Sequence, residues 1–121
     1  MLLTVDVGNT NITLGLFKED KVFATFRMNT QMVKTSDEYG STIAELIARK
    51  NININEIEDV IISSVVPKVM YSLNNGIIKY FGIKPIIVGT TDEIITLFKE
   101  YITLGTTDEI ITSSISLIFH R

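Results

Sequence analysis

The residues best suited to chemistry lie near the start of the chain, in the string Asp6-Val7-Gly8-Asn9-Thr10-Asn11. Glycine in such a turn lets backbone N–H groups approach a phosphate without a Cβ in the way. The side chains of Asn9 and Thr10 can add donors to the phosphate oxygens. The string therefore predicts a phosphate-binding turn that does not use a Walker sequence.

Asp6 adds a carboxylate to this turn. Mg²⁺ usually keeps several waters and takes one or two carboxylates together with substrate phosphates, so Asp6 alone is enough if ATP supplies the rest. A competing interpretation stays open. Gly8 and Asn9 could simply form a tight hairpin, with Asp6 paired to the amides of its own turn.

The apolar pattern around the string predicts the elements that position it. Residues 2–7 are apolar and β-branched, as in a strand, and residues 12–16 alternate between apolar and small or polar side chains. A polar turn at residues 18–21 leads to a third strand over residues 22–28. These segments predict a three-stranded antiparallel meander with Asp6 at the end of its first strand.

Helix and strand signals then alternate. Thr35 and Glu38 have the spacing of a capping box at the start of a helix, and an apolar run over residues 60–66 suits a strand buried on both faces. Pro67 and Gly82 bound a second helix, and residues 85–88 give a fifth strand. We predict an α/β fold with one mixed sheet, in the element order of an actin-like, ribonuclease H-like half-domain.

Composition limits the possible partners and location. The chain has 121 residues, a formal charge of -3 and no cysteine. Its Lys and Arg residues are scattered, which argues against a nucleic-acid partner. We expect no leader and no membrane span, because residues 1–7 are not basic and the apolar runs are short. A cytoplasmic protein is therefore predicted.

The last part of the chain contains a duplication. The sequence Gly-Thr-Thr-Asp-Glu-Ile-Ile-Thr occurs at residues 89–96 and again at 105–112, and each copy carries its own capping box. We therefore divide the chain into a half-domain over residues 1–89 and a helical tail over residues 90–121, which could be an incomplete second domain.

The sequence resembles the type III pantothenate kinases, a family of the acetate and sugar kinase, actin and heat-shock chaperone superfamily. Four stretches over residues 1–89 carry the resemblance: Asp6-Val7-Gly8-Asn9-Thr10-Asn11, Thr35-Ser36-Asp37-Glu38-Tyr39, Ile62-Ser63-Ser64-Val65-Val66-Pro67 and Tyr80-Phe81-Gly82-Ile83-Lys84-Pro85. The resemblance implies ATP-dependent phosphorylation of pantothenate in coenzyme A biosynthesis. It also implies Mg²⁺, a monovalent cation (K⁺ or NH₄⁺) and a cytoplasmic homodimer.

Residue roles follow from the resemblance. It implies that Asp6 is the magnesium-side carboxylate and that the first phosphate loop consists of Gly8, Asn9, Thr10, Asn11 and Thr13. The second phosphate loop of the family is not found in this sequence. In place of the family's Gly-Ala-Asp-Arg motif the chain offers Gly105 to Asp108, so Asp108 is the candidate general base. We expect a truncated kinase that is weakly active or inactive, because phosphoryl transfer needs groups on both sides of the nucleotide.

The sequence also contains residues with other expected roles and leaves other functions open. Ser63 and Ser64 are expected beside the cleft as neighbours of substrate or phosphate, whereas Phe23, Phe26, Tyr80 and Phe81 read as core. A non-catalytic regulatory or assembly module of the same fold is the first alternative. A ribonuclease H-like nuclease is a distant one, since it would need several carboxylates around two metals.

Overall fold

The computed structural model describes residues 1–19, 21–30, 33–64 and 66–88. Its strands are β1 (Leu2–Val7), β2 (Asn11–Lys18), β3 (Lys21–Asn29), β4 (Asp59–Ser64) and β5 (Ile86–Val88). Its helices are α1 (Ser36–Ala48) and α2 (Pro67–Phe81), and a 3₁₀ turn occupies Ile54–Glu56. The predicted order of strands and helices is confirmed.

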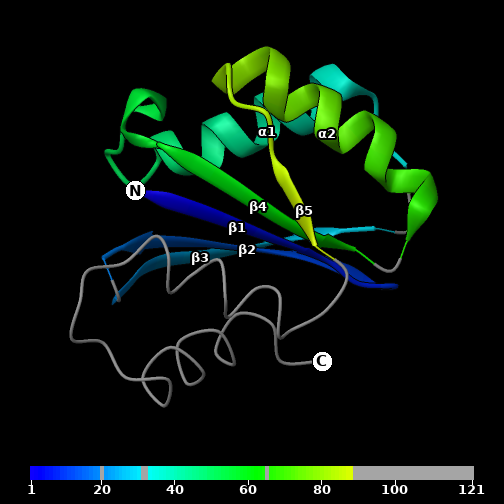
Figure 1. Ribbon diagram of the computed structural model, residues 1–121, viewed down its shortest axis with the longest axis horizontal. Coiled ribbons are helices and arrows are strands. Elements are labelled where there is room, and N and C mark those ends of the chain that lie inside the picture. Colours follow the sequence, from blue (N-terminus) through cyan, green and yellow to red (C-terminus); the bar gives the residue numbers. More distant parts are fainter. Residues whose placement is uncertain (20, 31–32, 65, 89–121) are drawn as a thin grey trace.

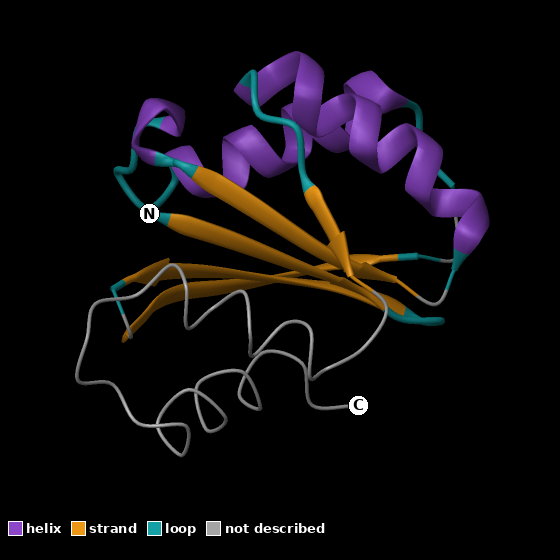
Figure 2. Cartoon of the chain, viewed as in Figure 1, coloured by secondary structure: helices purple, strands orange, loops and turns teal. Residues whose placement is uncertain are grey.

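The strands form one sheet in the order β3-β2-β1-β4-β5. β2 is antiparallel to both β1 and β3, whereas β4 is parallel to both β1 and β5. Both α1 and α2 lie on the same side of this sheet (Figures 1 and 2). The structure is thus the mixed-sheet α/β half-domain that the sequence predicts, with its antiparallel meander and parallel crossover strands.

The central strand, β1, is buried along its whole length. Leu3, Val5 and Val7 belong to the hydrophobic core that the sheet shares with the two helices. Because side chains alternate along a strand, Thr4 and Asp6 point to the opposite face. The core therefore fixes which face of the sheet carries the Asp6 carboxylate.

The ends of the helices are set by local sequence. The N–H of Glu38 donates to the Thr35 hydroxyl at 3.1 Å, and the N–H of Thr35 donates to Glu38 Oε1 at 3.1 Å, which completes the predicted capping box. Pro67 occupies the first turn of α2. Gly82 ends that helix in a left-handed conformation with φ of 68°, which glycine adopts without steric cost.

The two helices cross at a pair of glycines. A Cβ on Gly40 would lie 2.7 Å from the carbonyl oxygen of Gly76, and a Cβ on Gly76 would overlap the carbonyl oxygen of Ser36. The ring of Tyr80 also covers Gly40. The start of α1 can therefore rest directly on the backbone of α2 because neither contact residue has a side chain.

Three expectations need correction or lie outside the described residues. β4 ends at Ser64 and does not reach Val66, and the 3₁₀ turn was not predicted. Phe23 is 51% exposed and is not a core residue, whereas Phe26 packs against the core as expected. The predicted tail over residues 90–121 lies outside the described part of the chain. In the described ranges, no helix is long and apolar enough to cross a membrane.

Candidate phosphate-binding site

The turn between β1 and β2 is tight. The N–H of Gly8 donates to the carbonyl oxygen of Asn11 at 2.9 Å, and a Cβ on Gly8 would lie 3.2 Å from the same oxygen. Gly8 does not adopt a left-handed conformation. Glycine is favoured here by the close backbone approach. Its own N–H is used within the turn, so it is not among the turn donors that remain for a ligand.

Donors remain at the tip of this turn. Asn9, Thr10 and Asn11 are exposed. Among the residues that the structure describes, the backbone N–H groups of Asn9 and Thr10 have no acceptor. Two backbone donors and three polar side chains therefore face solvent at the carboxyl end of β1, which is the composition expected of a phosphate-binding turn.

Thr30, just after β3, holds the tip of the turn between β1 and β2 through two hydrogen bonds. Its hydroxyl donates to the carbonyl oxygen of Asn9 at 2.8 Å, and its backbone N–H donates to the carbonyl oxygen of Thr10 at 3.1 Å. Sequence reasoning missed Thr30. It lies 21 residues from Asn9, and no local pattern distinguishes it from any other polar residue after a strand.

The Asp6 carboxylate lies in a polar row across the sheet. Asp6 is opposite Thr13 of β2 and opposite Ser63 of β4 in the strand register. Residues paired in this way share a face of the sheet, on strands about 4.8 Å apart. Asp6 is 4% exposed and Ser63 is 6% exposed. The structure thus brings together three of the predicted site residues beneath the turn.

Ser64 follows Ser63 along the chain. It is the last residue of β4 and pairs with Val7, so it occupies the alternate register position to Ser63. In the register, Asp6 is therefore paired with Ser63 and not with Ser64. Asp108 lies outside the described residues, and its role as a base stays a prediction.

The donor set suits one kind of metal site. Within the described ranges, no group of three or more His, Cys, Asp or Glu side chains is placed to hold a metal ion. Asp6 is a single carboxylate flanked by hydroxyl side chains. Such a set fits Mg²⁺ that is held mainly by phosphate oxygens and water, and it does not fit an all-protein cage for a metal.

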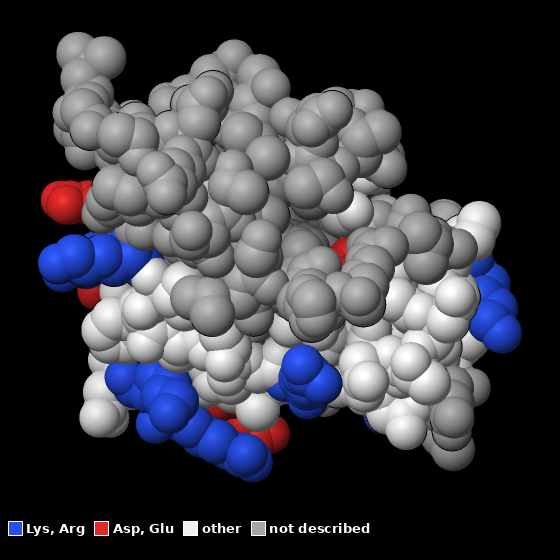
Figure 3. Space-filling model, turned by 90° about the horizontal axis from the view of Figure 1, so that it is seen from below, with Lys and Arg blue, Asp and Glu red and all other residues white. Residues whose placement is uncertain are grey.

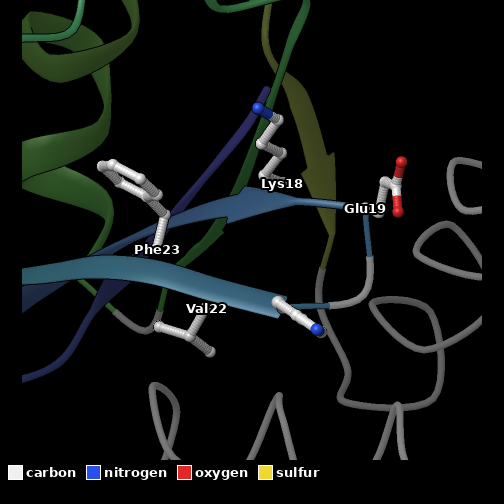
Figure 4. Close-up of a pocket in the computed structure, with 5 residues that line it drawn as sticks. Lys18, Glu19, Val22 and Phe23 are labelled. Atoms are coloured by element: carbon white, nitrogen blue, oxygen red, sulfur yellow. The ribbon is translucent and has the colours of Figure 1, made fainter.

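A hollow of about 310 Å³ occurs at the turn between β2 and β3, lined by Lys18, Glu19, Lys21, Val22 and Phe23. Figure 4 shows Phe23 and Val22 on opposite sides of their strand. In the register, this turn lies beyond the pair Leu2 and Phe17, whereas Asp6 lies at the other end of β1. The hollow is therefore separate from the candidate site.

An ion pair ties the start of α1 to the end of α2. The Lys79 Nζ lies 2.7 Å from Asp37 Oδ1, and the Tyr80 hydroxyl donates to the same oxygen at 3.4 Å. The hydrogen bond and charge of Lys79 lower the pKa of Asp37, and Asp37 in turn raises the pKa of Lys79. Both groups are well exposed, so the pair links the two helices at the surface and adds little to stability.

In the view from the side opposite the helices, the visible charged side chains form separate groups (Figure 3). Seen from that side, Lys and Arg side chains lie at several points around the described surface, with Asp and Glu beside some of them (Figure 3). The basic side chains visible in this view thus do not form one continuous track of the kind that follows a phosphodiester backbone.

Solved structures support the fold. A proposed N-acetylglucosamine kinase from Porphyromonas gingivalis superposes with a TM-score of 0.54 at 19% identity, over 74% of this chain and 34% of that one. RuvC from Thermus thermophilus superposes with a TM-score of 0.58 at 13% identity, over 98% of this chain and 78% of that one. At these identities the two likenesses concern architecture alone.

Sequence relatives are more specific. The type III pantothenate kinase of Agathobacter rectalis is 54% identical over 88 residues, which are 73% of this chain and 34% of that protein. The same enzyme of Bifidobacterium longum subsp. infantis is 44% identical over 89 residues, or 74% and 35% of the two chains. The chain spans about a third of the length of these curated relatives. The family model for type III pantothenate kinase matches residues 2–111, and the chain therefore belongs to the type III pantothenate kinase family.

Proposed function

We propose that this chain provides the amino-terminal, phosphate-holding wall of an ATP-dependent pantothenate kinase. The observation that carries the proposal is the arrangement of Asp6 between Thr13 and Ser63, at the end of β1 that leads into the exposed turn at Asn9 and Thr10. Family membership supplies the substrate class, since the relatives are type III pantothenate kinases. The site would bind the phosphates of ATP, whose γ-phosphoryl group passes to a hydroxyl of pantothenate.

Each group has a distinct part in this proposal. The N–H groups and side chains of Asn9 and Thr10 would donate to phosphate oxygens, where negative charge is greatest. Asp6 would hold Mg²⁺, which supplies charge neutralisation of the phosphates when it is bound. Ser63 and Thr13 would orient the Asp6 carboxylate or its water ligands through their hydroxyls. The monovalent cation expected for the family has no assigned ligand among the described residues.

Catalysis by the chain alone should be slow. Phosphoryl transfer depends on positioning and electrostatic stabilisation around the whole phosphate, and the described residues supply these groups from one side only. We propose that a second wall, and a homodimer as in the resemblance, are needed for full activity. A non-catalytic module would bind nucleotide equally well, so nucleotide binding tests the site and a turnover assay tests the enzyme.

The test of the site is Asp6→Asn. The amide keeps the shape of the side chain and removes the charge that would hold Mg²⁺. Thermal melts are taken with and without ATP–Mg²⁺. At one hundred times its dissociation constant, the ligand should stabilise the wild type by about 2.7 kcal/mol and the variant by almost nothing.

Asp59→Asn is the matched control. Asp59 pairs with Leu2 at the other end of β1, so the same chemical change is made on the same sheet but away from the turn. This variant should keep the full stabilisation by ATP–Mg²⁺. Equal ligand-induced shifts of the melting temperature in the wild type and in Asp6→Asn would show that Asp6 is not part of the metal site.

A further inference from the structure

Thr30 is a buried polar residue outside the set of groups assigned to the ligand. It is 3% exposed, and it lies immediately after β3. Its two hydrogen bonds, 2.8 Å to Asn9 and 3.1 Å to Thr10, reach two consecutive carbonyl groups of the turn. Thr30 therefore restrains two neighbouring peptide groups of the turn from its position just after β3, a strand that is not part of this turn.

The direction of these bonds determines where the turn amides point. A trans peptide carries its N–H on the side opposite to its C=O, and the described chain contains no cis peptide. Because the carbonyls of Asn9 and Thr10 are held toward Thr30, the N–H groups of the next residues, Thr10 and Asn11, are turned away from it. Thr30 thus orients the Thr10 N–H, which is one of the two backbone donors of the turn, although it makes no hydrogen bond to that group.

We propose that Thr30 is a positioning residue that pre-orders the turn for phosphate, and that its hydroxyl raises nucleotide affinity by holding the Asn9 peptide. The proposal rests on the phosphate-binding function of the turn. A preordered donor set binds more tightly because less conformational entropy is lost on binding. Without the hydroxyl, the Asn9 carbonyl can turn to water, and the Thr10 N–H loses its fixed direction.

The test compares substitutions that remove a buried hydroxyl in two places. Thr30→Val removes the hydroxyl and keeps the branched shape, whereas Thr30→Ser keeps the hydroxyl. Thr4→Val is the matched control, because the Thr4 hydroxyl is also buried and donates to a backbone carbonyl, that of Gly15 at 3.4 Å. The dissociation constant for ATP–Mg²⁺ is measured on the labelled full chain from the amide signals of residues 6–13.

Thr30→Val should weaken binding about fivefold to tenfold, the value of one hydrogen bond of ordinary strength. Thr30→Ser and Thr4→Val should bind within about twofold of the wild type, although Thr4→Val loses thermal stability much as Thr30→Val does. The amide signals of Thr10 and Asn11 in the ligand-free protein should shift in Thr30→Val and not in Thr4→Val. If Thr30→Val does not fold, Thr30→Ala takes its place with the same expectations.

The outcomes separate this inference from the function on which it rests. If the wild type does not bind ATP–Mg²⁺, the phosphate-binding function fails and the role of Thr30 fails with it. If the wild type binds and Thr30→Val binds equally well, only the role of Thr30 is overturned. Equal losses of affinity in Thr30→Val and Thr4→Val would show a general effect of stability and would also overturn it.

Discussion

The surroundings of the Asp6 carboxylate are set by its neighbours in the register. Thr13 and Ser63 occupy the two adjacent positions, so both flanking side chains are short and can hydrogen-bond to a carboxylate. A larger apolar side chain in either position would cover the carboxylate and raise the cost of its charge. The row therefore places an acidic group between two hydroxyl side chains, in a sheet whose other central residues are mostly apolar.

This arrangement predicts the effect of a second charge. In Ser63→Asp two carboxylates would occupy adjacent register positions, and their repulsion should lower the free energy of unfolding at pH 7 by at least about 1 kcal/mol. A divalent cation bound between them would relieve the repulsion. Thermal melts should therefore show a larger stabilisation by Mg²⁺ in Ser63→Asp than in the wild type.

Ser63→Asn is the control for this experiment, because it has a similar size and no charge. It should gain nothing from Mg²⁺ beyond the wild-type response. If Mg²⁺ shifts the melts of Ser63→Asp and Ser63→Asn equally, the side chains at positions 6 and 63 do not meet as the register places them.

At the scale of elements, the close crossing of α1 and α2 depends on two glycines, Gly40 and Gly76, which have no side chain. A methyl group on Gly76 would overlap the Ser36 carbonyl, so the helices would have to separate. Gly76→Ala should therefore lower the free energy of unfolding by about 3 kcal/mol, although alanine is the better helix former. Asn75→Ala, one position earlier on the same helix, should be neutral or slightly stabilising. Urea unfolding of both variants measures the difference, and a stable Gly76→Ala would show that the helices are further apart.

The capping box of α1 predicts a pH dependence. Hydrogen bonds from the Thr35 backbone N–H and hydroxyl lower the pKa of Glu38 below its ordinary value of 4.5. Since the folded state holds the lower pKa, this contribution to stability is fully present above about pH 4.5 and is lost as the pH falls through the folded-state pKa. Glu38→Gln keeps a capping partner but does not titrate.

The measurement is the midpoint of urea unfolding for both proteins between pH 7 and pH 3. The wild type should be the more stable at neutral pH, and its advantage over Glu38→Gln should shrink as the solution becomes more acidic. A difference in stability between the two proteins that is constant over this pH range would show that the cap does not depend on the charge of the Glu38 carboxylate.

Most of the fold could be predicted because its signals are local. The alternation of apolar and polar residues indicated the strands. The capping-box spacing of Thr35 and Glu38 indicated the start of α1, and the positions of Pro67 and Gly82 indicated the bounds of α2. The link from Thr30 to the turn could not be predicted, because it joins residues 21 positions apart and depends on the exact register of β2 and β3. The site was predicted from residue types, whereas the pairing of Asp6 with Ser63 required the parallel register of β4.

At the scale of the whole molecule, the sheet ends at a short, apolar edge. β5 has three residues, and Ile86 and Ile87 are 40% and 56% exposed. An exposed apolar edge strand is a surface for pairing with another chain. We therefore predict self-association of the chain in solution, consistent with the proposed homodimer.

Light scattering over a wide concentration range tests this prediction. The wild type should show an average mass above the 13.6 kDa of one chain, and Ile87→Lys should move that mass toward one chain by placing a charge on the edge. Tyr71→Lys changes an exposed apolar residue on α2 and should leave the mass unchanged. A monomer at all concentrations would contradict the prediction.

The central position of β1 also governs the order of events in folding. Its pairing with β2 needs only a short turn, and such hairpins form in about 1 to 10 μs. Its pairing with β4 joins residues that are far apart in the sequence, such as Leu2 and Asp59, so a long loop must close first. During synthesis on the ribosome, the meander can thus form while one side of β1 still lacks its neighbour. The nascent chain passes through a stage in which β1, which is buried along its whole length in the folded protein, is an open edge, and the arrival of β4 ends that exposure.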